Sequence, residues 1–374
     1  MRIGVVAAEM ERQRTGVGRY LAGLLHGIRA LDPGWEWILF FQGRRFDHPL
    51  WSSGAVTPVF CERGGSPVLW EQLWLPRFLA RHALDLVHSP AYSLPPRLPA
   101  PGVVTIHDLS FEVLPEEFGW RERWRRRLLA RHAAGRAARV LTDTERVAGE
   151  LGARYRIGRD RLGVVPLALD PVFLAPPAAP AVQAASALEE LGVRPPYLLQ
   201  VGTVLERRCP ELVLEAFSEL ARERPGLSLV LAGANRLRRP LRLAETVARL
   251  GLEGRVTVLG YVADSVLPEL YRRAELSLYV SRYEGFGLPP LESLACATPV
   301  VVSAGLALDE IWPDYPLRCA SLERDELVRV IRRGLADGPL RAGIVGHASE
   351  LCAGRSWRDS AGLFLRQLEM AAAR

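Results

Sequence analysis

The sequence predicts an α/β protein with two doubly wound domains, each built on a parallel sheet with helices on both faces. Its 374 residues suggest two domains at roughly 150 residues per domain. Short apolar, β-branched segments alternate with longer segments of helical period, an order typical of parallel sheets. A segment rich in proline and alanine, residues 170–180, separates two such series and is predicted to be a linker.

The first series predicts strands at residues 3–7, 37–41, 86–88, 103–106 and 140–142. The second series predicts strands at residues 197–201, 227–231, 256–259, 276–280 and 300–302. Between the strands, segments such as 20–28, 212–223 and 325–335 have apolar residues at helical spacing. Because ligands of such sheets bind outside the carboxyl ends of the strands, the loops that follow the strands are the places to seek a site.

The composition excludes several kinds of chemistry. All 48 basic residues are arginine, which against 42 acidic residues gives a net charge of +6. Without lysine there is no Schiff-base lysine and no lysine of a Walker phosphate loop. The fixed positive charge comes from guanidinium groups, which suit bidentate contacts with phosphate.

The five cysteines are scattered and include no Cys-x-x-Cys pair, so neither a disulfide framework nor a structural zinc site is expected. A reducing cytoplasm is therefore the predicted location. The apolar run at the start is too short for a signal peptide, and we expect no membrane-spanning helix, which would need about 18 apolar residues.

The most informative segment is residues 281–292, which read SRYEGFGLPPLE and follow a predicted strand. Its glycines allow a tight turn with exposed amides, and a proline suits the first turn of a helix. Amides at a helix start bind anions. Glu284 on the loop and Glu292 in the helix then suit hydroxyl groups of a sugar or a ribose. The alternative is a glycine-rich turn with a solvated glutamate at each end.

This segment resembles the E-x7-E motif of retaining glycosyltransferases of family 4, which have the GT-B fold. The resemblance continues through residues 293–301, SLACATPVV. Further landmarks are residues 15–20 (TGVGRY), 70–72 (WEQ), 85–90 (DLVHSP), 104–110 (VTIHDLS) and 197–203 (YLLQVGT). These landmarks occur in the order found in the family, and the resemblance covers essentially the whole chain.

The resemblance implies a GT-B fold with two Rossmann-like doubly wound domains that face each other across a cleft. Residues 1–172 would form the acceptor-side domain, with a C-terminal helix at about 357–374 packing back on it. Residues 181–356 would bind the nucleotide sugar, and residues 170–180 would link the two domains.

The implied activity is the metal-independent, retaining transfer of a hexose-type sugar from a nucleotide-diphosphate sugar. GDP- and UDP-sugars are the expected donors. The acceptor would be a hydroxyl of a glycan, a lipid-linked saccharide or a natural product, as in bacterial polysaccharide biosynthesis. No cofactor beyond the donor substrate is implied. The sequence has no Asp-x-Asp pair of the kind that holds a divalent metal in transferases of another fold.

The resemblance assigns catalytic roles to Glu284, His107 and Arg208, and no residue to a metal. His107 would hydrogen-bond the donor sugar, and Glu292 would bind the ribose. The donor nucleotide sugar would be bound by Gly16, Gly18, Thr203, Arg207, Arg208, Tyr261, Val262, Glu284, Gly285, Phe286, Gly287, Leu288 and Glu292.

Two adjacent arginines follow the predicted strand 197–201, where the family has a basic clamp for the diphosphate. Negative charge develops on the departing diphosphate, and a site without a metal needs other cations there. On an extended backbone, neighbouring side chains point to opposite sides, so we expect Arg208 rather than Arg207 to bind phosphate. The alternative is a solvated surface pair.

Several residues depart from the family pattern, among them Ala168, Val280, Ala297 and Cys209. Ala297 stands where a glycine usually precedes Thr-Pro, and Cys209 stands where Asn or His often follows the basic pair. Neither change removes a charged group, but Ala297 puts a methyl group near a tight helix end.

Residues 120–139 form the most basic stretch, with eight arginines. Trp120, Trp124 and Leu128 share one helical face. This helix would either touch anionic lipid on the inner face of the membrane or bury its aromatic face in the core and leave its arginines in solvent. No nucleic-acid partner is expected, because no reader motif is present.

Two other interpretations stay open for the whole chain. One is a sugar-nucleotide epimerase or hydrolase of the same fold. The other is a non-catalytic protein that binds nucleotide sugars, which the joint presence of Glu284, Glu292, His107 and Arg208 disfavours.

Overall fold

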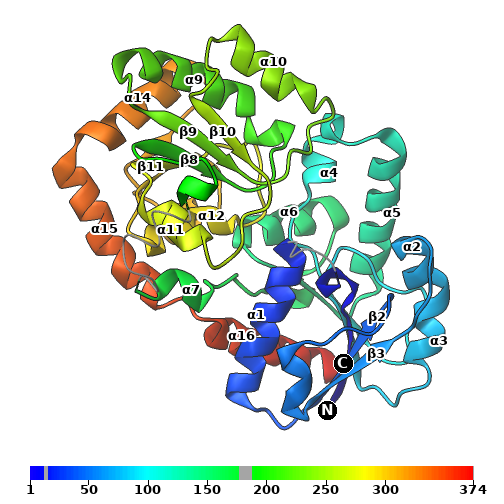
Figure 1. Ribbon diagram of the computed structural model, residues 1–374. Helices are drawn as coiled ribbons and strands as arrows, with labels where there is room; N and C mark the ends of the chain where they lie inside the picture. Colours follow the sequence, from blue (N-terminus) through cyan, green and yellow to red (C-terminus); the bar gives the residue numbers. More distant parts are fainter. Residues whose placement is uncertain (12–15, 177–187, 374) are drawn as a thin grey trace. The chain divides into compact units, whose positions relative to one another are not determined.

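A computed structural model of the chain describes residues 1–11, 16–176 and 188–373. Two compact units make up the structure (Figure 1). The first unit contains Met1–Ala168 and Ser356–Arg374, and the second contains Leu169–Arg355. The boundary lies just before the predicted linker, of which residues 177–180 fall outside the described residues.

The first unit is built on a seven-stranded parallel sheet in the order β3-β2-β1-β4-β5-β6-β7. The strands are β1 (Arg2–Val6), β2 (Glu36–Phe41), β3 (Val56–Phe60), β4 (Leu86–Ser89), β5 (Gly102–Thr105), β6 (Arg139–Thr142) and β7 (Leu162–Val164). Because every pair is parallel, all carboxyl ends meet at one edge of the sheet.

Alternating residues of these strands supply two separate cores. Val5 packs in the core that includes α1 and α16, whereas its neighbour Val6 packs with α3 on the opposite face. On that opposite face, α5 and α6 cover a further core beside β5 and β6. The helices of this unit are α1 (Gly16–Leu31), α2 (Pro67–Leu69), α3 (Leu75–Leu79), α4 (Ser110–Val113), α5 (Trp120–Arg136), α6 (Glu145–Tyr155) and α16 (Trp357–Ala372).

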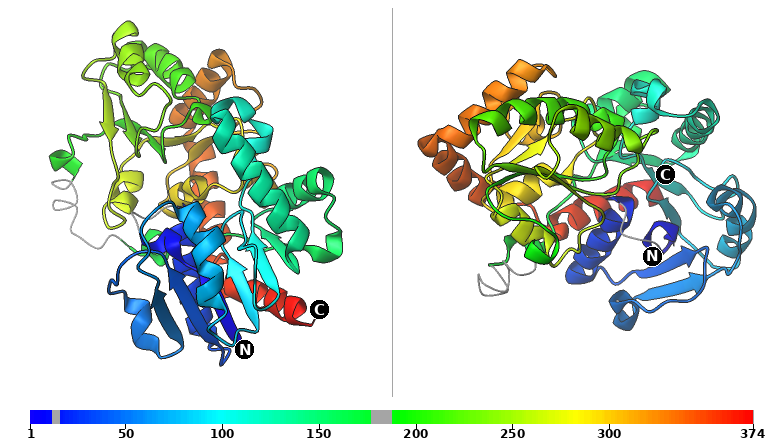
Figure 2. Two further views of the ribbon diagram at one scale, coloured as in Figure 1. Left: turned by 90° about the vertical axis from the view of Figure 1, so that its right-hand side faces the viewer. Right: turned by 45° about the horizontal axis from the view of Figure 1, so that its top comes forward.

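The C-terminal helix α16 belongs to the first unit, where it packs against α1 (Figure 2). Glycines on α1 permit this close approach, since a methyl group on Gly27 would overlap the backbone carbonyl of Trp357. Phe364 of α16 packs against Trp37 of β2, with ring centroids 6.4 Å apart.

The second unit has a six-stranded parallel sheet in the order β10-β9-β8-β11-β12-β13. Its strands are β8 (Tyr197–Val201), β9 (Ser228–Ala232), β10 (Val256–Leu259), β11 (Leu276–Tyr279), β12 (Val300–Ser303) and β13 (Arg318–Cys319). The helices are α7 (Pro171–Leu174), α9 (Pro210–Glu223), α10 (Leu241–Arg249), α11 (Leu267–Arg272), α12 (Leu288–Ala295), α13 (Leu308–Ile311), α14 (Arg324–Ala336) and α15 (Gly338–Ala353).

Part of the predicted linker is folded. The Asp170 side chain caps α7 by accepting a hydrogen bond from the Val172 amide at 3.1 Å. Phe173 is buried and packs edge-on against Tyr271. These contacts attach residues 170–174 to the second unit, which the proline and alanine content did not indicate.

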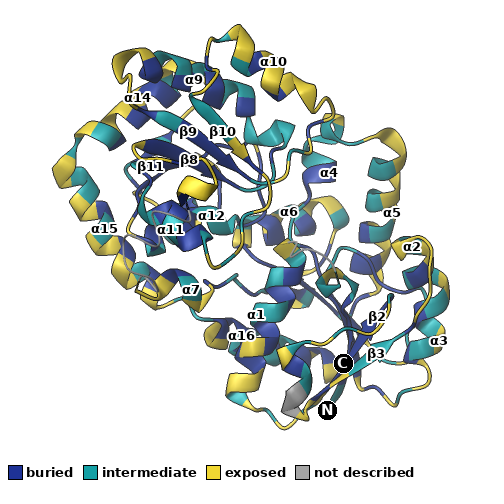
Figure 3. Ribbon diagram, viewed as in Figure 1, coloured by how far each residue is buried: buried dark blue, intermediate teal, exposed yellow. Residues whose placement is uncertain are grey.

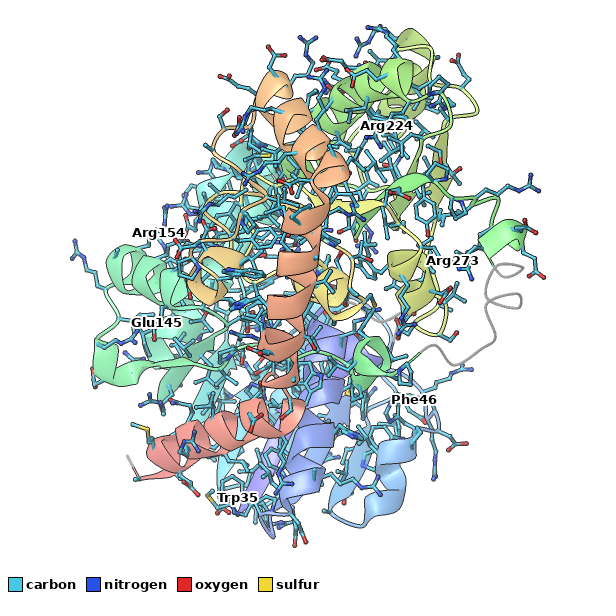
Figure 4. All side chains as sticks on the ribbon, turned by 90° about the vertical axis from the view of Figure 1, so that its left-hand side faces the viewer. Trp35, Phe46, Glu145, Arg154, Arg224 and Arg273 are labelled. Atoms are coloured by element: carbon cyan, nitrogen blue, oxygen red, sulfur yellow. The ribbon has the colours of Figure 1, made fainter. Side chains whose placement is uncertain are left out.

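The central strands of both sheets are buried, and many exposed residues lie on the outer faces of the helices (Figure 3). Exposed arginines such as Arg154 and Arg224 project from the ribbon (Figure 4). Among the described helices, none combines the length and the apolar character needed to cross a membrane.

Candidate functional site

The strand order of the second unit places a topological switch point between β8 and β11. The chain continues from β8 to β9 on one side, and from β11 to β12 on the other. Loops therefore diverge at the carboxyl ends of β8 and β11, where doubly wound sheets bind ligands. Thr203, Arg207 and Arg208 follow β8, and the predicted residues 284–288 follow β11.

Arg208 and Glu284 meet at this switch point as a charge pair. Arg208 Nε donates to Glu284 Oε1 at 2.8 Å, and Arg208 Nη2 lies 3.4 Å from Oε2. Nη1 donates to the backbone oxygen of Thr203 at 3.1 Å, and the guanidinium lies 5.5 Å from the ring centroid of Tyr279. Several independent contacts thus fix the guanidinium before any ligand arrives.

Arg207 points toward the same carboxylate, with its Nε 3.6 Å from Glu284 Oε1. The expectation that the two arginines point apart was therefore wrong. It assumed an extended backbone, whereas Glu206–Arg208 form a turn of 3-10 helix. The buried Nε of Arg207 makes no hydrogen bond to the described residues, but it forms an ion pair with Glu284 at 3.6 Å.

Ser281 completes the surroundings of Glu284. Its hydroxyl lies 3.2 Å from Glu284 Oε1, and its amide donates to Ser303 Oγ on β12 at 2.9 Å. Burial alone would raise the pKa of Glu284, but the charges of Arg208 and Arg207 lower it below its ordinary value. Glu284 is therefore ionised at neutral pH. A carboxyl group with a lowered pKa stabilises the fold above its unfolded pKa, and this contribution is lost as the pH falls through the folded value.

Two glycines make this arrangement possible. Gly202 has φ +120°, and a methyl group there would overlap Arg208 Nη1. Gly287 has φ +85°, and its Cβ would lie 2.6 Å from the Tyr279 hydroxyl. Tyr279 itself stays protonated at neutral pH, because burial raises its pKa above the ordinary range.

The start of α12 offers fewer amides to an anion than the sequence suggested. The helix begins at Leu288, so Pro289 and Pro290 occupy its first turn and lack N–H groups. Glu292 is buried within α12 and accepts a hydrogen bond from the Tyr271 hydroxyl at 3.0 Å. The positive charge at this edge therefore comes mainly from the two arginines.

The other residues predicted to bind the donor nucleotide sugar belong to both units. Tyr261 and Val262 follow β10 at the same edge of the second sheet, and Tyr261 is exposed. In the first unit, Gly16 begins α1 and Gly18 lies buried in its first turn. Thr15 of the same landmark lies outside the described residues.

His107, at the end of β5, has both ring nitrogens occupied. Nδ1 lies 2.8 Å from Asp143 Oδ2 and Nε2 lies 3.0 Å from the Pro90 oxygen. A backbone carbonyl only accepts hydrogen bonds, so Nε2 is the donor to Pro90, and the Asp143 carboxyl group faces Nδ1. Burial would lower the pKa of His107, but the charge of Asp143 outweighs it and raises the pKa. The expected hydrogen bond to a donor sugar would require one of these contacts to break.

The aromatic face of α5 is exposed, contrary to the alternative that placed it in the core. Trp120, Trp124 and Leu128 are 70%, 56% and 62% exposed. The buried side of the helix carries only small residues, Ala130, Ala133 and Ala134.

The two departures from the family pattern at Ala297 and Cys209 coincide with left-handed backbone, whereas those at Ala168 and Val280 do not. Ala297 has φ +58° and Cys209 has φ +49°, a conformation that glycine and asparagine adopt at lower cost. We expect Ala297→Gly and Cys209→Asn each to raise the free energy of unfolding by ~0.5–1 kcal/mol. This figure already includes the opposing effect of glycine, which increases the entropy of the unfolded chain.

Thermal melting checks this prediction. Ala248→Gly on the exposed face of α10 is the matched control. Because Ala248 has right-handed helical backbone, its replacement by glycine should lower the free energy of unfolding by about 1 kcal/mol. A lower melting temperature for Ala297→Gly, in step with the control, would contradict the prediction.

Comparison with known proteins agrees with the fold. The profile described as "Glycosyltransferase Family 4" matches residues 14–173, and the one described as "Glycosyl transferases group 1" matches residues 186–349. O-antigen chain mannosyltransferase B of Escherichia coli is 31% identical over 347 residues, which cover 87% of this chain and 88% of the relative.

Solved structures share the fold at low sequence identity. The sucrose-phosphate synthase of Thermosynechococcus elongatus has a TM-score of 0.78 at 20% identity, with 99% of each chain covered. WaaG, a glycosyltransferase involved in lipopolysaccharide biosynthesis, has a TM-score of 0.76 at 18% identity, with 97% of this chain and 98% of WaaG covered. Anabaena HepE, solved in complex with UDP and glucose, has a TM-score of 0.75 at 16% identity, with 98% of this chain and 99% of HepE covered.

Two parallel α/β units of this topology define the GT-B class of glycosyltransferases, as the sequence predicted. Within that class, the chain belongs to glycosyltransferase family 4. It is therefore a glycosyltransferase that acts on sugar-nucleotide donors.

Sequence reasoning missed several residues around the site. Tyr279 ends a strand without a distinctive motif, and Asp143 lies far along the chain from its partner His107. Gly202 was noted only as part of the landmark 197–203, with no role of its own. Glu71 was noted only as part of the landmark Trp70-Glu71-Gln72, which gave no indication of its environment.

Proposed function

We propose that the chain is a retaining glycosyltransferase that moves a hexose from a nucleotide-diphosphate sugar to a hydroxyl group without a metal ion. The observation that carries this proposal is the Arg207–Arg208–Glu284 cluster at the switch point of the second unit. Pre-organised cations stabilise the charge that develops on the departing diphosphate, which is the role a metal ion has elsewhere.

Within this proposal, Arg208 contacts the diphosphate and Arg207 adds a second positive charge beside it. Glu284 orients both arginines and offers its remaining lone pairs to hydroxyls of the sugar. Glu292 binds the ribose, while Tyr261 and Val262 border the base, and the loop 285–288 lines the diphosphate. In the first unit, the amides of Gly16 and Gly18 reach the donor. His107 contributes a positive charge in its protonated form, which Asp143 favours, rather than a hydrogen bond.

We propose a mannosyl donor first, because the Escherichia coli relative is named a mannosyltransferase that acts on the O-antigen chain. The same name supports a glycan or lipid-linked saccharide as the acceptor.

The test is the release of free nucleoside diphosphate from a panel of GDP- and UDP-sugars, with and without a chelator. We expect GDP-mannose to be consumed equally in both conditions, and the product to keep the anomeric configuration of the donor. A loss of turnover that added magnesium restores, or an inverted anomer, would refute the mechanism. Release of free sugar in place of a glycoside would identify a hydrolase.

We also propose that α5 rests on an anionic membrane surface. Arg121 and Arg125 are exposed beside the apolar face of Trp120, Trp124 and Leu128. Apolar side chains flanked by arginines match an interface that combines acyl chains with anionic headgroups. By contrast, Arg127 of the same helix forms an ion pair with Glu112 inside the unit.

Vesicle binding checks this proposal. Sedimentation with vesicles rich in phosphatidylglycerol should remove most of the wild-type protein from solution at low salt. Replacing Trp120, Trp124 and Leu128 together by serine should abolish most of that binding. The control is Leu241→Ser on α10, which removes a leucine that is 74% exposed. Equal losses for the triple variant and the control would argue against α5 as the contact.

A further inference from the structure

Glu71 lies at the carboxyl edge of the first sheet. It belongs to a π-helical turn, Trp70–Trp74, a distortion that often marks functional sites. Its Oε2 accepts a hydrogen bond from Ser93 Oγ at 2.7 Å, in the loop that follows β4. The charge of Glu9, which follows β1, also acts on this carboxyl group. Since β1 and β4 are neighbours, Glu71 lies at the switch point of this sheet.

Glu71 has no cationic partner among the described residues, in contrast to Glu112 and Glu284. Glu112 forms ion pairs with Arg127 and Arg131, and Glu284 does so with Arg207 and Arg208. Among the described residues, no arginine lies within ion-pair distance of Glu71, although the chain has 48. A buried carboxyl group without a cation lowers stability, and such violations concentrate at functional sites.

The electrostatics of this position select the kind of ligand. Burial raises the pKa of Glu71 to about 7, and the negative charge of Glu9 adds to the rise. Two carboxyl groups repel a diphosphate, so the donor is a poor ligand here. A neutral saccharide is a good one, because its hydroxyls both donate to a carboxylate and accept from a carboxylic acid.

We propose that Glu71 binds a hydroxyl of the acceptor saccharide, with Ser93 holding its carboxyl group in place. This assignment rests on the proposed transferase function and adds a specificity-determining residue in the first unit.

The first experiment measures binding of octyl α-mannoside and related alkyl glycosides to the full chain saturated with GDP, by calorimetry. Glu71→Gln should weaken binding at least tenfold while leaving GDP affinity unchanged. Glu112→Gln, the matched control in the same unit, should leave both affinities unchanged. Unchanged glycoside affinity in Glu71→Gln overturns the proposal, as does a wild-type protein that binds none of the glycosides. Failure of the transferase function itself is seen separately, as a lack of nucleoside diphosphate release by the wild-type protein.

A melting experiment separates this role from a structural one. A carboxyl group with a raised pKa favours the fold at low pH, and that contribution is lost as the pH rises through the folded value of about 7. Glu71→Gln should therefore melt above the wild-type protein at pH 8 but not at pH 5. Glu112→Gln should melt at a lower temperature than the wild-type protein at pH 8, because the substitution breaks the ion pairs with Arg127 and Arg131. If Glu71→Gln also melts lower at pH 8, Glu71 is structural and the proposal fails.

Discussion

Replacing Arg208 by alanine is expected to lower turnover by ~10²–10³-fold, with a smaller effect on donor affinity. The guanidinium is held by Glu284, Thr203 and Tyr279, so it needs no reorganisation when charge moves onto the diphosphate. An interaction that strengthens in the transition state changes turnover more than ground-state binding. Arg207→Ala should have a smaller effect, because Arg207 approaches Glu284 at a longer distance and is less rigidly held.

Steady-state turnover and calorimetric donor affinity measure this effect, and stability must be followed alongside. Without Arg208, the buried Glu284 loses its nearest cation, at a cost of about 3–5 kcal/mol. The double variant Arg208→Ala/Glu284→Gln removes the uncompensated charge. It should recover thermal stability without recovering turnover. Recovery of both would show that Arg208 acts only on the fold.

Gly202→Ala is expected to impair turnover about as strongly as Arg208→Ala, although it removes no functional group. The added methyl group would overlap Arg208 Nη1, so the guanidinium has to leave its position between Thr203 and Glu284. The φ of +120° also disfavours an L side chain, which adds ~1–3 kcal/mol of backbone strain.

Gly254→Ala separates the two causes. Gly254 has φ +74° in the same unit, but no atom lies within 4 Å of the place that an added methyl group would occupy, so only strain should result. We expect a lower melting temperature and wild-type turnover for this control. Wild-type turnover in Gly202→Ala as well would mean that Arg208 tolerates displacement, contrary to the pre-organisation argument.

The strands that sequence analysis missed have a common physical cause. β3, β7 and β13 lie at sheet edges, where a strand pairs on one side only and needs little apolar sequence. β3 even contains Pro58, which lowers its strand signal. The central strands, buried on both faces, are continuous apolar runs and were predicted within a residue or two.

For the site, the sequence placed Arg207, Arg208 and Glu284 after two strands but did not predict the directions of their side chains. The contact between Arg208 and Glu284 and the common direction of the two arginines depend on a 3-10 turn that no sequence pattern indicated. On α5, helical spacing grouped Trp120 with Trp124 but did not tell which face is buried. The face of α5 that carries the alanines is the buried one, because small side chains allow the helix to approach the sheet closely.

The position of α16 constrains the order of folding during translation. Residues 1–168 leave the ribosome before the second unit, yet the face of α1 around Gly27 stays uncovered until residues 356–374 have followed that unit. The second unit is continuous in sequence and can complete its folding before the first unit does. This order is the reverse of the N-terminus-first folding that is usual for nascent multidomain chains. The apolar side of α1 is accordingly the surface that a chaperone would meet on the growing polypeptide.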